Sequence, residues 1–96
     1  MMLLQLLPQA ERDVRDLWSY VAEDNPAAAT RVARAIFDTL DRLLEQPRMG
    51  VPRPELADDL RAMVSGQYLI FYRPLETCIQ VVRILHGRRD LHADLF

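Results

Sequence analysis

The stretch Tyr68–Asp90 (YLIFYRPLETCIQVVRILHGRRD) constrains the fold of this chain most strongly. Its first part, Tyr68–Arg73, is rich in the aromatic and β-branched residues that favour strands. Pro74 ends this strand, because proline has no N–H to donate to a sheet ladder. A second apolar strand follows over Ile79–His86, after a loop of ordinary hairpin length. The stretch therefore predicts a β-hairpin.

Positive charge is concentrated on this hairpin. Arginines lie in it or just beyond it at Arg73, Arg83, Arg88 and Arg89, against the single acid Glu76. The whole chain has 12 basic and 14 acidic residues, and its net charge of −2 argues against a general binder of nucleic acids or membrane surfaces. All the basic residues are arginines, which can bind carboxylates or phosphates but are poor general acids or bases.

The N-terminal part of the chain predicts one strand and two helices. Met1–Leu7 is almost wholly apolar and predicts a short strand that is buried on both faces. From Pro8, apolar residues recur with helical spacing and predict an amphipathic helix of about four turns, with Trp18 in the core. Asn25 suits the N-cap of a second helix, which ends before Pro47.

The length of 96 residues predicts a single domain, and its C-terminal part predicts further strands. Pro47–Asp59 is rich in proline and predicts a surface connection that is partly extended, and Leu60–Ser65 predicts a strand. The apolar tail Leu91–Phe96 leaves helical and extended conformations open. The order βααβββ predicts an α+β fold: an antiparallel sheet of three to four strands with the N-terminal helical hairpin packed on one face.

The face of the sheet without helices is expected to carry an apolar patch. In the strand Ile79–His86, both alternating sets of side chains are largely apolar, with Ile79, Val81 and Leu85 on one face and Val82 and Ile84 on the other. Two helices can cover only one face of such a sheet. The other face should therefore expose apolar side chains beside the arginines, which is typical of a surface for a partner.

The remaining composition bears on the compartment and on cofactors. The single cysteine, Cys78, cannot form an internal disulfide, and this favours a reducing cytoplasm. The apolar N-terminus lacks a basic leader, and no run approaches the about 18 apolar residues that a membrane span requires. The spacing of His86, Asp90 and His92 matches no established ligand pattern, so neither a metal site nor a cofactor is expected.

Three segments, GVPRPEL, SGQYLIFYRP and IQVVRILHGRRD, resemble the RelE/ParE superfamily of bacterial toxins, and the resemblance covers essentially the whole chain. It implies the toxin half of a type II toxin–antitoxin pair. The implied partner is a small ParD-like antitoxin of the ribbon-helix-helix type, which wraps its C-terminal segment around the toxin in a hetero-oligomer. One branch of the superfamily contains ribosome-dependent endoribonucleases that cleave mRNA, and ParE-type toxins inhibit DNA gyrase.

The resemblance favours the ParE-type branch. The catalytic lysines, arginines and tyrosine of the nuclease branch fall on or near Leu60, Ala62, Leu69 and Leu95, and only Arg89 still matches. Metal-free RNA cleavage needs groups that accept and donate protons, which arginine does poorly. We therefore expect a protein-binding inhibitor more than an enzyme. The alternatives are a ribonuclease built on His86 and Arg89, and a non-toxic relative that retains only antitoxin binding.

Two sets of site residues follow in this context. The target-binding set is Arg83, His86, Arg88 and Arg89. The antitoxin-binding set is Tyr68, Tyr72, Arg73, Val82 and Ile84. Structural roles stay open for several of them: an ion pair for Arg83, backbone hydrogen bonds for His86, packing for the tyrosines and simple solvation for the two terminal arginines. No membrane contact and no sequence-specific binding of nucleic acid is expected.

Overall fold

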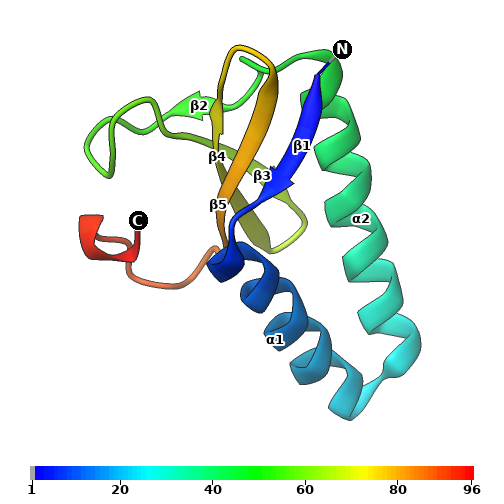
Figure 1. The fold of residues 1–96 in the computed structure, drawn as a ribbon. Coiled ribbons are helices and arrows are strands. Elements are labelled where there is room, and N and C mark those ends of the chain that lie inside the picture. The colour runs from blue at the N-terminus through cyan, green and yellow to red at the C-terminus, as the bar shows by residue number, and fades with distance from the viewer. Residues whose placement is uncertain (1) are drawn as a thin grey trace.

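The computed structural model describes residues 2–96, which have an α+β fold (Figure 1). The elements in chain order are β1 (Leu3–Leu6), α1 (Pro8–Asp24), α2 (Pro26–Glu45), β2 (Val51–Pro52), β3 (Arg61–Ser65), β4 (Tyr68–Pro74), β5 (Cys78–His86) and the 3₁₀ helix η1 (Ala93–Leu95). The predicted fold class is confirmed. None of the helices described for these residues is long and apolar enough to cross a membrane.

The sheet has five strands in the order β1-β5-β4-β3-β2, one more than the largest number predicted. Strands β3, β4 and β5 form the predicted antiparallel meander. The sheet is mixed, because β1 pairs with β5 in parallel. The long connection between these two parallel strands contains the helical hairpin and then β2, β3 and β4. The extra strand, β2, is a two-residue pairing with β3 inside the segment that was expected to be a partly extended connection.

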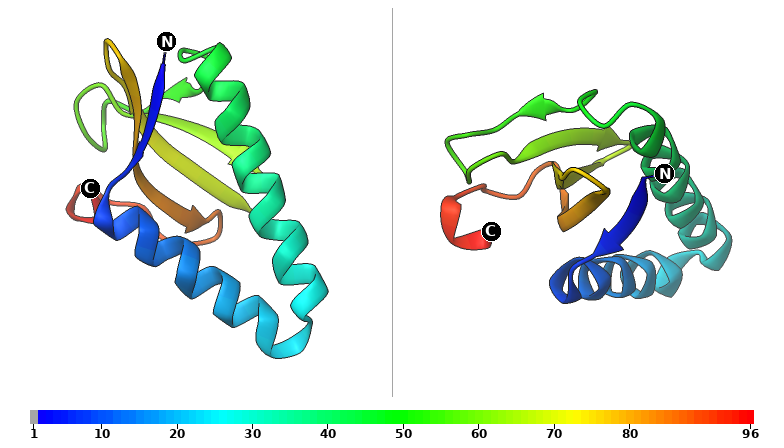
Figure 2. Two further views of the ribbon diagram at one scale, coloured as in Figure 1. Left: turned by 45° about the vertical axis from the view of Figure 1, so that its right-hand side comes forward. Right: turned by 45° about the horizontal axis from the view of Figure 1, so that its top comes forward.

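Sequence signals for helix ends place the two helices. Pro8 and Pro26 lie at the first positions, where a missing N–H costs nothing. Asn25 alone separates the helices, and its Oδ1 accepts a hydrogen bond of 3.1 Å from the N–H of Ala28, as an N-cap does. Figures 1 and 2 show the helices as a V that lies on one side of the sheet.

The core between the helices and the sheet contains a buried polar group, the Tyr72 hydroxyl. The Tyr72 side chain is fully buried. Its hydroxyl donates a hydrogen bond of 2.8 Å to the carbonyl of Pro47 and accepts one of 2.8 Å from the N–H of Gly50. A Cβ at Gly50 would lie 2.5 Å from this hydroxyl, so the close approach requires glycine. Burial raises the pKa of the Tyr72 phenol above its usual value.

A β-bulge in β5 changes which side chains face the helices. Phe71 pairs with Arg83 and Tyr72 pairs with Val81, so Val82 is an extra residue in β5. After the bulge the alternation is reversed: Ile84 packs with the helices, and Leu85 packs on the opposite face. The strict alternation expected from the sequence, which put Leu85 with Val81, is therefore wrong beyond the bulge.

The second face of the sheet is also covered. Its buried residues are Leu56, Leu60, Ala62, Phe71, Val82 and Leu85. Leu56 and Leu60 belong to the loop between β2 and β3, and the C-terminal tail adds Leu91, Leu95 and Phe96. Figure 2 shows this loop and the tail on the side of the sheet away from the helices. The expectation of an exposed apolar patch there is wrong, because two irregular segments supply the missing layer.

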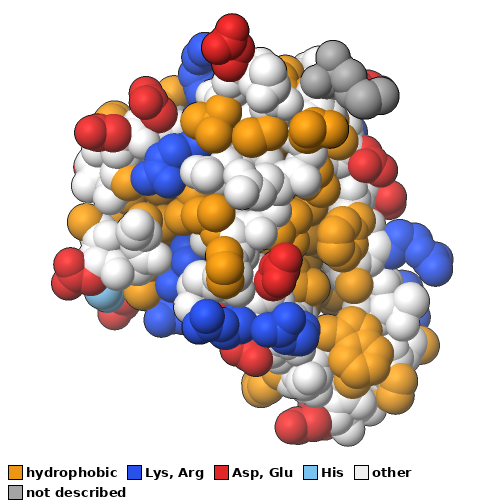
Figure 3. Space-filling model, in the orientation of Figure 1, with side chains coloured by type: hydrophobic (Ala, Val, Ile, Leu, Met, Phe, Trp, Pro, Cys, Tyr) orange, Lys and Arg blue, Asp and Glu red, His pale blue; other side chains and the backbone are white. Residues whose placement is uncertain are grey.

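Two apolar residues near the N-terminus are more exposed than expected. Trp18 is 42% exposed, because its neighbour Leu17 takes the buried position on α1. Leu3 is 60% exposed, so β1 is not buried on both faces. Leu4 and Leu6 pack in the core with the helices, whereas Leu3 alternates away from it on an edge strand. Figure 3 shows hydrophobic side chains at the surface over the two helices.

Candidate functional site

The turn after β5 presents two arginines to solvent. The N–H of Gly87 donates a hydrogen bond of 2.8 Å to the carbonyl of Gln67, and the N–H of Arg89 donates one of 3.0 Å to the carbonyl of His86. The N–H of Arg88 donates to Nδ1 of His86 at 3.1 Å. These bonds fix the backbone of the turn, while the side chains of Arg88 and Arg89 remain exposed.

His86 connects this turn to the turn between β3 and β4 through its two ring nitrogens. Because Nδ1 accepts from Arg88, the proton of the neutral ring lies on Nε2, which faces Oε1 of Gln67 at 3.3 Å. The ring of Tyr68 packs edge-on against the imidazole, with centroids 5.4 Å apart. His86 therefore has the hydrogen-bonded structural role that the sequence left open. In residues 2–96, no three histidine, cysteine, aspartate or glutamate side chains gather closely enough to hold a metal ion.

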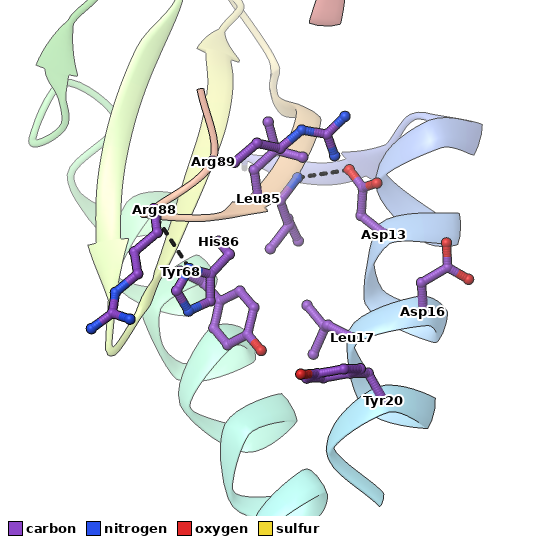
Figure 4. Close-up of a pocket in the computed structure, with 10 residues that line it drawn as sticks. Asp13, Asp16, Leu17, Tyr20, Tyr68, Leu85, His86, Arg88 and Arg89 are labelled. Carbon is purple, nitrogen blue, oxygen red and sulfur yellow. Dashed lines mark hydrogen bonds between the residues drawn. The ribbon is translucent and has the colours of Figure 1, made fainter. Parts of the chain in front are cut away.

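A hollow of about 480 Å³ lies between this turn and α1. It is lined from α1 by Asp13, Asp16, Leu17 and Tyr20, and from β4, β5 and the turn by Tyr68, Ile84, Leu85, His86, Arg88 and Arg89. Figure 4 shows Tyr20 and Tyr68 directed toward one another beside Leu17. Tyr20 is 75% exposed.

The α1 side of this hollow was missed by the sequence reasoning. Asp13, Asp16 or Leu17, and Tyr20 recur every three to four residues, which places them on one stripe of a helix. That spacing was available in the sequence. The packing of this stripe against the end of β5 was not, because it depends on the angle at which α1 leaves β1.

The guanidinium groups of Arg88 and Arg89 have no ionic partner in the described part of the chain. No carboxylate of residues 2–96 lies within 4.0 Å of either group. Asp13 and Asp16 line the same hollow, but Asp13 is already paired with Arg83. The turn therefore combines two free positive charges with an aromatic and apolar hollow.

Arg83 has a different environment from these two arginines. Its Nε and Nη2 bind Oδ2 and Oδ1 of Asp13 at 2.8 and 2.9 Å, and its Nη1 donates to the carbonyl of Leu95 at 3.1 Å. Oδ2 of Asp13 also accepts a hydrogen bond of 3.0 Å from the N–H of Ile84. The side chains of Arg83 and Asp13 are only 11% and 8% exposed. The hydrogen bonds to Asp13 raise the pKa of Arg83, against the opposing effect of burial.

This ion pair is the structural alternative that the sequence left open for Arg83. Its carboxylate partner comes from α1, and its third contact comes from the tail. A guanidinium with these partners is not available as a free anchor for a target. We therefore do not retain Arg83 in the target-binding set.

The expected antitoxin-binding residues divide into two groups. Tyr72, Val82 and Ile84 are buried in the isolated chain, at 0, 5 and 2% exposure. Tyr68 and Arg73 are half-buried and reach solvent, and Nε of Arg73 donates to the carbonyl of Asp58 at 3.0 Å. Only the second group offers surface to a partner without movement of the covering elements.

Comparisons with known proteins agree with this fold. Residues 4–91 match the model of the family described as "ParE toxin of type II toxin-antitoxin system, parDE". The chain is 29% identical to Toxin ParE1 of Caulobacter vibrioides over 95% of both chains, and 29% identical to Toxin ParE1 of Mycobacterium tuberculosis over 94% of both. It is 33% identical to Toxin RelE1 of Caulobacter vibrioides, over 82% of this chain and 86% of that one.

A solved structure supports the fold independently. The structure titled "Chromosomal ParDE TA system from P. aeruginosa" superposes with a TM-score of 0.75 at 22% identity, covering 90% of this chain and 96% of the other. The family match extends from within β1 to beyond the arginine turn, so it includes both sides of the hollow. The chain belongs to the ParE toxin family of type II toxin–antitoxin systems.

Proposed function

We propose that this protein inhibits growth in the cytoplasm by binding DNA gyrase, and that a cognate antitoxin neutralises it. The observation that carries the proposal is the pair of free guanidinium groups, Arg88 and Arg89, at a hollow that also contains Tyr20 and Tyr68. Arginine and tyrosine are enriched among the residues that dominate the affinity of protein interfaces. Relatives named Toxin ParE1 agree with the toxin role.

The chemistry of the turn supports binding more than catalysis. Proton transfer needs a side chain with a suitable pKa and a free nitrogen or oxygen. Both ring nitrogens of His86 already have hydrogen-bond partners, which are the N–H of Arg88 and Oε1 of Gln67. Arginine is a poor general acid or base, so neither Arg88 nor Arg89 can take over this role from His86. The turn can therefore bind acidic groups on a protein, and this binding involves no step that breaks a covalent bond.

The antitoxin is proposed to be a ParD-like protein of the ribbon-helix-helix type that forms a hetero-oligomer with the toxin. The structural neighbour is titled as a ParDE system, which supports an antitoxin partner. Tyr68 and Arg73 are the expected contacts that already lie at the surface. Tyr68 also lines the hollow at the arginine turn, so an antitoxin that covers it would compete with the target there.

The decisive experiment replaces both arginines. Arg88→Ala/Arg89→Ala should abolish growth inhibition and the inhibition of DNA supercoiling by purified gyrase, because the anchoring charges are lost. The matched control is Arg15→Ala/Arg34→Ala, which removes two exposed arginines from the helices. Thermal unfolding should show that both variants remain folded. Undiminished toxicity of the Arg88→Ala/Arg89→Ala variant would refute the assignment of the turn.

A second function, ribosome-dependent cleavage of mRNA, is favoured by one observation. The relative that is 33% identical is named Toxin RelE1. The candidate catalytic residues for this alternative are His86 and Arg89. Primer extension on mRNA under translation should detect cleavage sites for the unmodified protein, and these should disappear in His86→Ala/Arg89→Ala. A gyrase assay without inhibition, combined with such cleavage, would select this function over the first.

A further inference from the structure

We infer that a second hollow, at the opposite end of the sheet from Arg88 and Arg89, binds a carboxylate side chain of a partner polypeptide. The hollow has a volume of about 340 Å³ and is lined by Arg48, Pro52, Pro54, Asp59, Leu60, Arg61 and Pro74. Arg61 begins β3 and pairs with Tyr72, whereas the other end of β3 pairs with Tyr68 near the arginine turn. The inference is independent of the proposed gyrase target.

Arg61 is held in place by the loop before β2. Its Nη1 donates hydrogen bonds of 3.0 Å to the carbonyl of Arg48 and 2.8 Å to the carbonyl of Gly50. The same loop is fixed from the other side, because the N–H of Gly50 donates to the Tyr72 hydroxyl. A guanidinium fixed in this way loses little conformational entropy on binding a ligand.

Most donors of the two guanidinium groups remain unused. Within residues 2–96, neither Nε nor Nη2 of Arg61 has a hydrogen-bond acceptor, and the Arg48 guanidinium has none. No carboxylate of these residues lies within 4.0 Å of either group, although Asp59 lines the same hollow. Arginine pairs preferentially with planar oxyanions through two parallel hydrogen bonds.

The residues that form the walls of this hollow leave the two arginines as its principal hydrogen-bond donors. Pro52, Pro54 and Pro74 have no backbone N–H, and their rings fix the backbone around the hollow. Leu60 contributes a nearly buried apolar side chain. An incoming carboxylate would thus meet rigid apolar walls and two charged donor groups, which is a suitable site for one acidic side chain.

Asp59 bears on the class of ligand. It lines the hollow and has φ = 59°, a left-handed conformation that aspartate and asparagine adopt more readily than most residues. Glu55 of the same loop is already paired with Arg53 at 2.7 Å, so the Asp59 carboxylate is the acidic group that lines the hollow. It would repel a polyphosphate chain, which carries many negative charges, more than it would repel a single carboxylate. An isolated carboxylate on a protein therefore fits better than a nucleic acid.

The test is an NMR titration of the full chain that follows the arginine Nε–H signals. The probe is a short capped peptide of alternating alanine and glutamate, and the control peptide has glutamine in place of glutamate. We expect saturable shifts confined to Arg48, Arg61 and the neighbouring loop with the glutamate peptide alone. Arg48→Ala should weaken binding at least about fivefold, as expected for the loss of a charge-assisted pair. The control Arg34→Ala should change nothing.

Asp59→Asn provides a gain-of-binding test. Asparagine tolerates the left-handed conformation, so the loop is retained while the competing negative charge is removed. Binding of the glutamate peptide should strengthen about twofold to threefold. The inference is overturned if the glutamine peptide binds equally, if shifts spread over all arginines, or if Arg48→Ala has no effect. Tighter saturation of the same site by inorganic phosphate or by oligothymidylate would also overturn it.

Discussion

Arg83 and the pair Arg88–Arg89 are the same type of residue in one short stretch, and their environments are opposite. Arg83 is buried and gives its guanidinium to Asp13 and to the carbonyl of Leu95. Arg88 and Arg89 are exposed, and no carboxylate of residues 2–96 lies within 4.0 Å of them. The number of arginines in a stretch of sequence therefore does not identify a binding surface. The partner that neutralises Arg83 lies 70 residues away on α1.

The buried ion pair also explains how the sheet edge is closed. Beyond its pairing with β1, the edge of β5 would leave the N–H of Ile84 unsatisfied, and the carboxylate of Asp13 accepts its hydrogen bond. One carboxylate thus serves a guanidinium and a backbone group together. Arg83 stabilises the fold through this arrangement, whereas Arg88 and Arg89 are left for partners.

The largest effect on stability should follow from removing the carboxylate partner of Arg83. Asp13→Ala leaves a buried guanidinium without its partner and should lower the free energy of unfolding by about 3–5 kcal/mol. The double variant Asp13→Ala/Arg83→Met should recover only part of this loss, because the uncompensated charge is removed while the N–H of Ile84 still lacks its acceptor. Urea unfolding measures both. A cost below about 1 kcal/mol for Asp13→Ala would show that Arg83 is not a structural residue.

A neutral buried group should matter less than the buried charge. Tyr72→Phe leaves the N–H of Gly50 and the carbonyl of Pro47 without their partner, and should cost about 1–3 kcal/mol at neutral pH. Urea unfolding of the two proteins at one pH measures this cost. An equal or larger loss than that of Asp13→Ala would contradict the ranking of charge above hydroxyl.

The same variant tests the pH dependence of Tyr72. The pKa of this phenol is raised in the folded state, so its contribution is complete below the unfolded pKa of about 10. Above about pH 10 the unfolded chain loses the proton first, and stability falls as pH rises toward the folded pKa. Between about pH 9 and about pH 11, the free energy of unfolding should fall more for the unmodified protein than for Tyr72→Phe. Equal differences would contradict the raised pKa.

The C-terminal tail should contribute less to the free energy of unfolding than the buried ion pair does. The ring of Phe96 packs edge-on against Phe71 with centroids 4.7 Å apart, but Phe96 is only partly buried. Phe96→Ala should therefore cost about 1–2 kcal/mol, less than truncation of a fully buried phenylalanine. Thermal unfolding measures the change. The control Leu3→Ala removes an exposed side chain and should cost less. If Phe96→Ala costs nothing, the tail does not stabilise the second face.

The smallest effect on stability should follow from replacing the two exposed arginines of the turn. Arg88→Ala/Arg89→Ala should change the free energy of unfolding by less than about 0.5 kcal/mol, because neither side chain is buried or paired. Growth inhibition should nevertheless be lost under the proposed function. Urea unfolding beside a growth assay separates the two quantities. A destabilisation close to that of Asp13→Ala would abolish the distinction between the two kinds of arginine.

Local signals predicted the order of elements, and tertiary contacts decided the rest. Pro8, Asn25 and Pro26 marked the helix ends correctly because their effects act within a few residues. The bulge at Val82 was not predictable from alternation, since it depends on the register against β4. The burial of the second face needed the tail and the β2–β3 loop, whose sequences carry no regular period.

The candidate site was predicted only in part. The exposed position of Arg88 and Arg89 follows from their place in a turn after a strand, and their role toward a target stays a prediction. The ion pair of Arg83 and the contribution of Tyr20 both required the position of α1. Neither could be inferred from the sequence of the hairpin alone, because that sequence does not determine where α1 packs against β5.

The parallel pairing of β1 with β5 has a consequence for the timing of folding. Gln5 and Gln80 are neighbours in the sheet, yet 75 residues separate them. At roughly 5–20 residues per second, synthesis of that interval on a ribosome takes about 4–15 s, during which the first strand has no partner. Contacts at such separation also slow folding after release. The complete sheet, and with it the arginine turn and the hollow beside α1, therefore forms only once the last strand has been made.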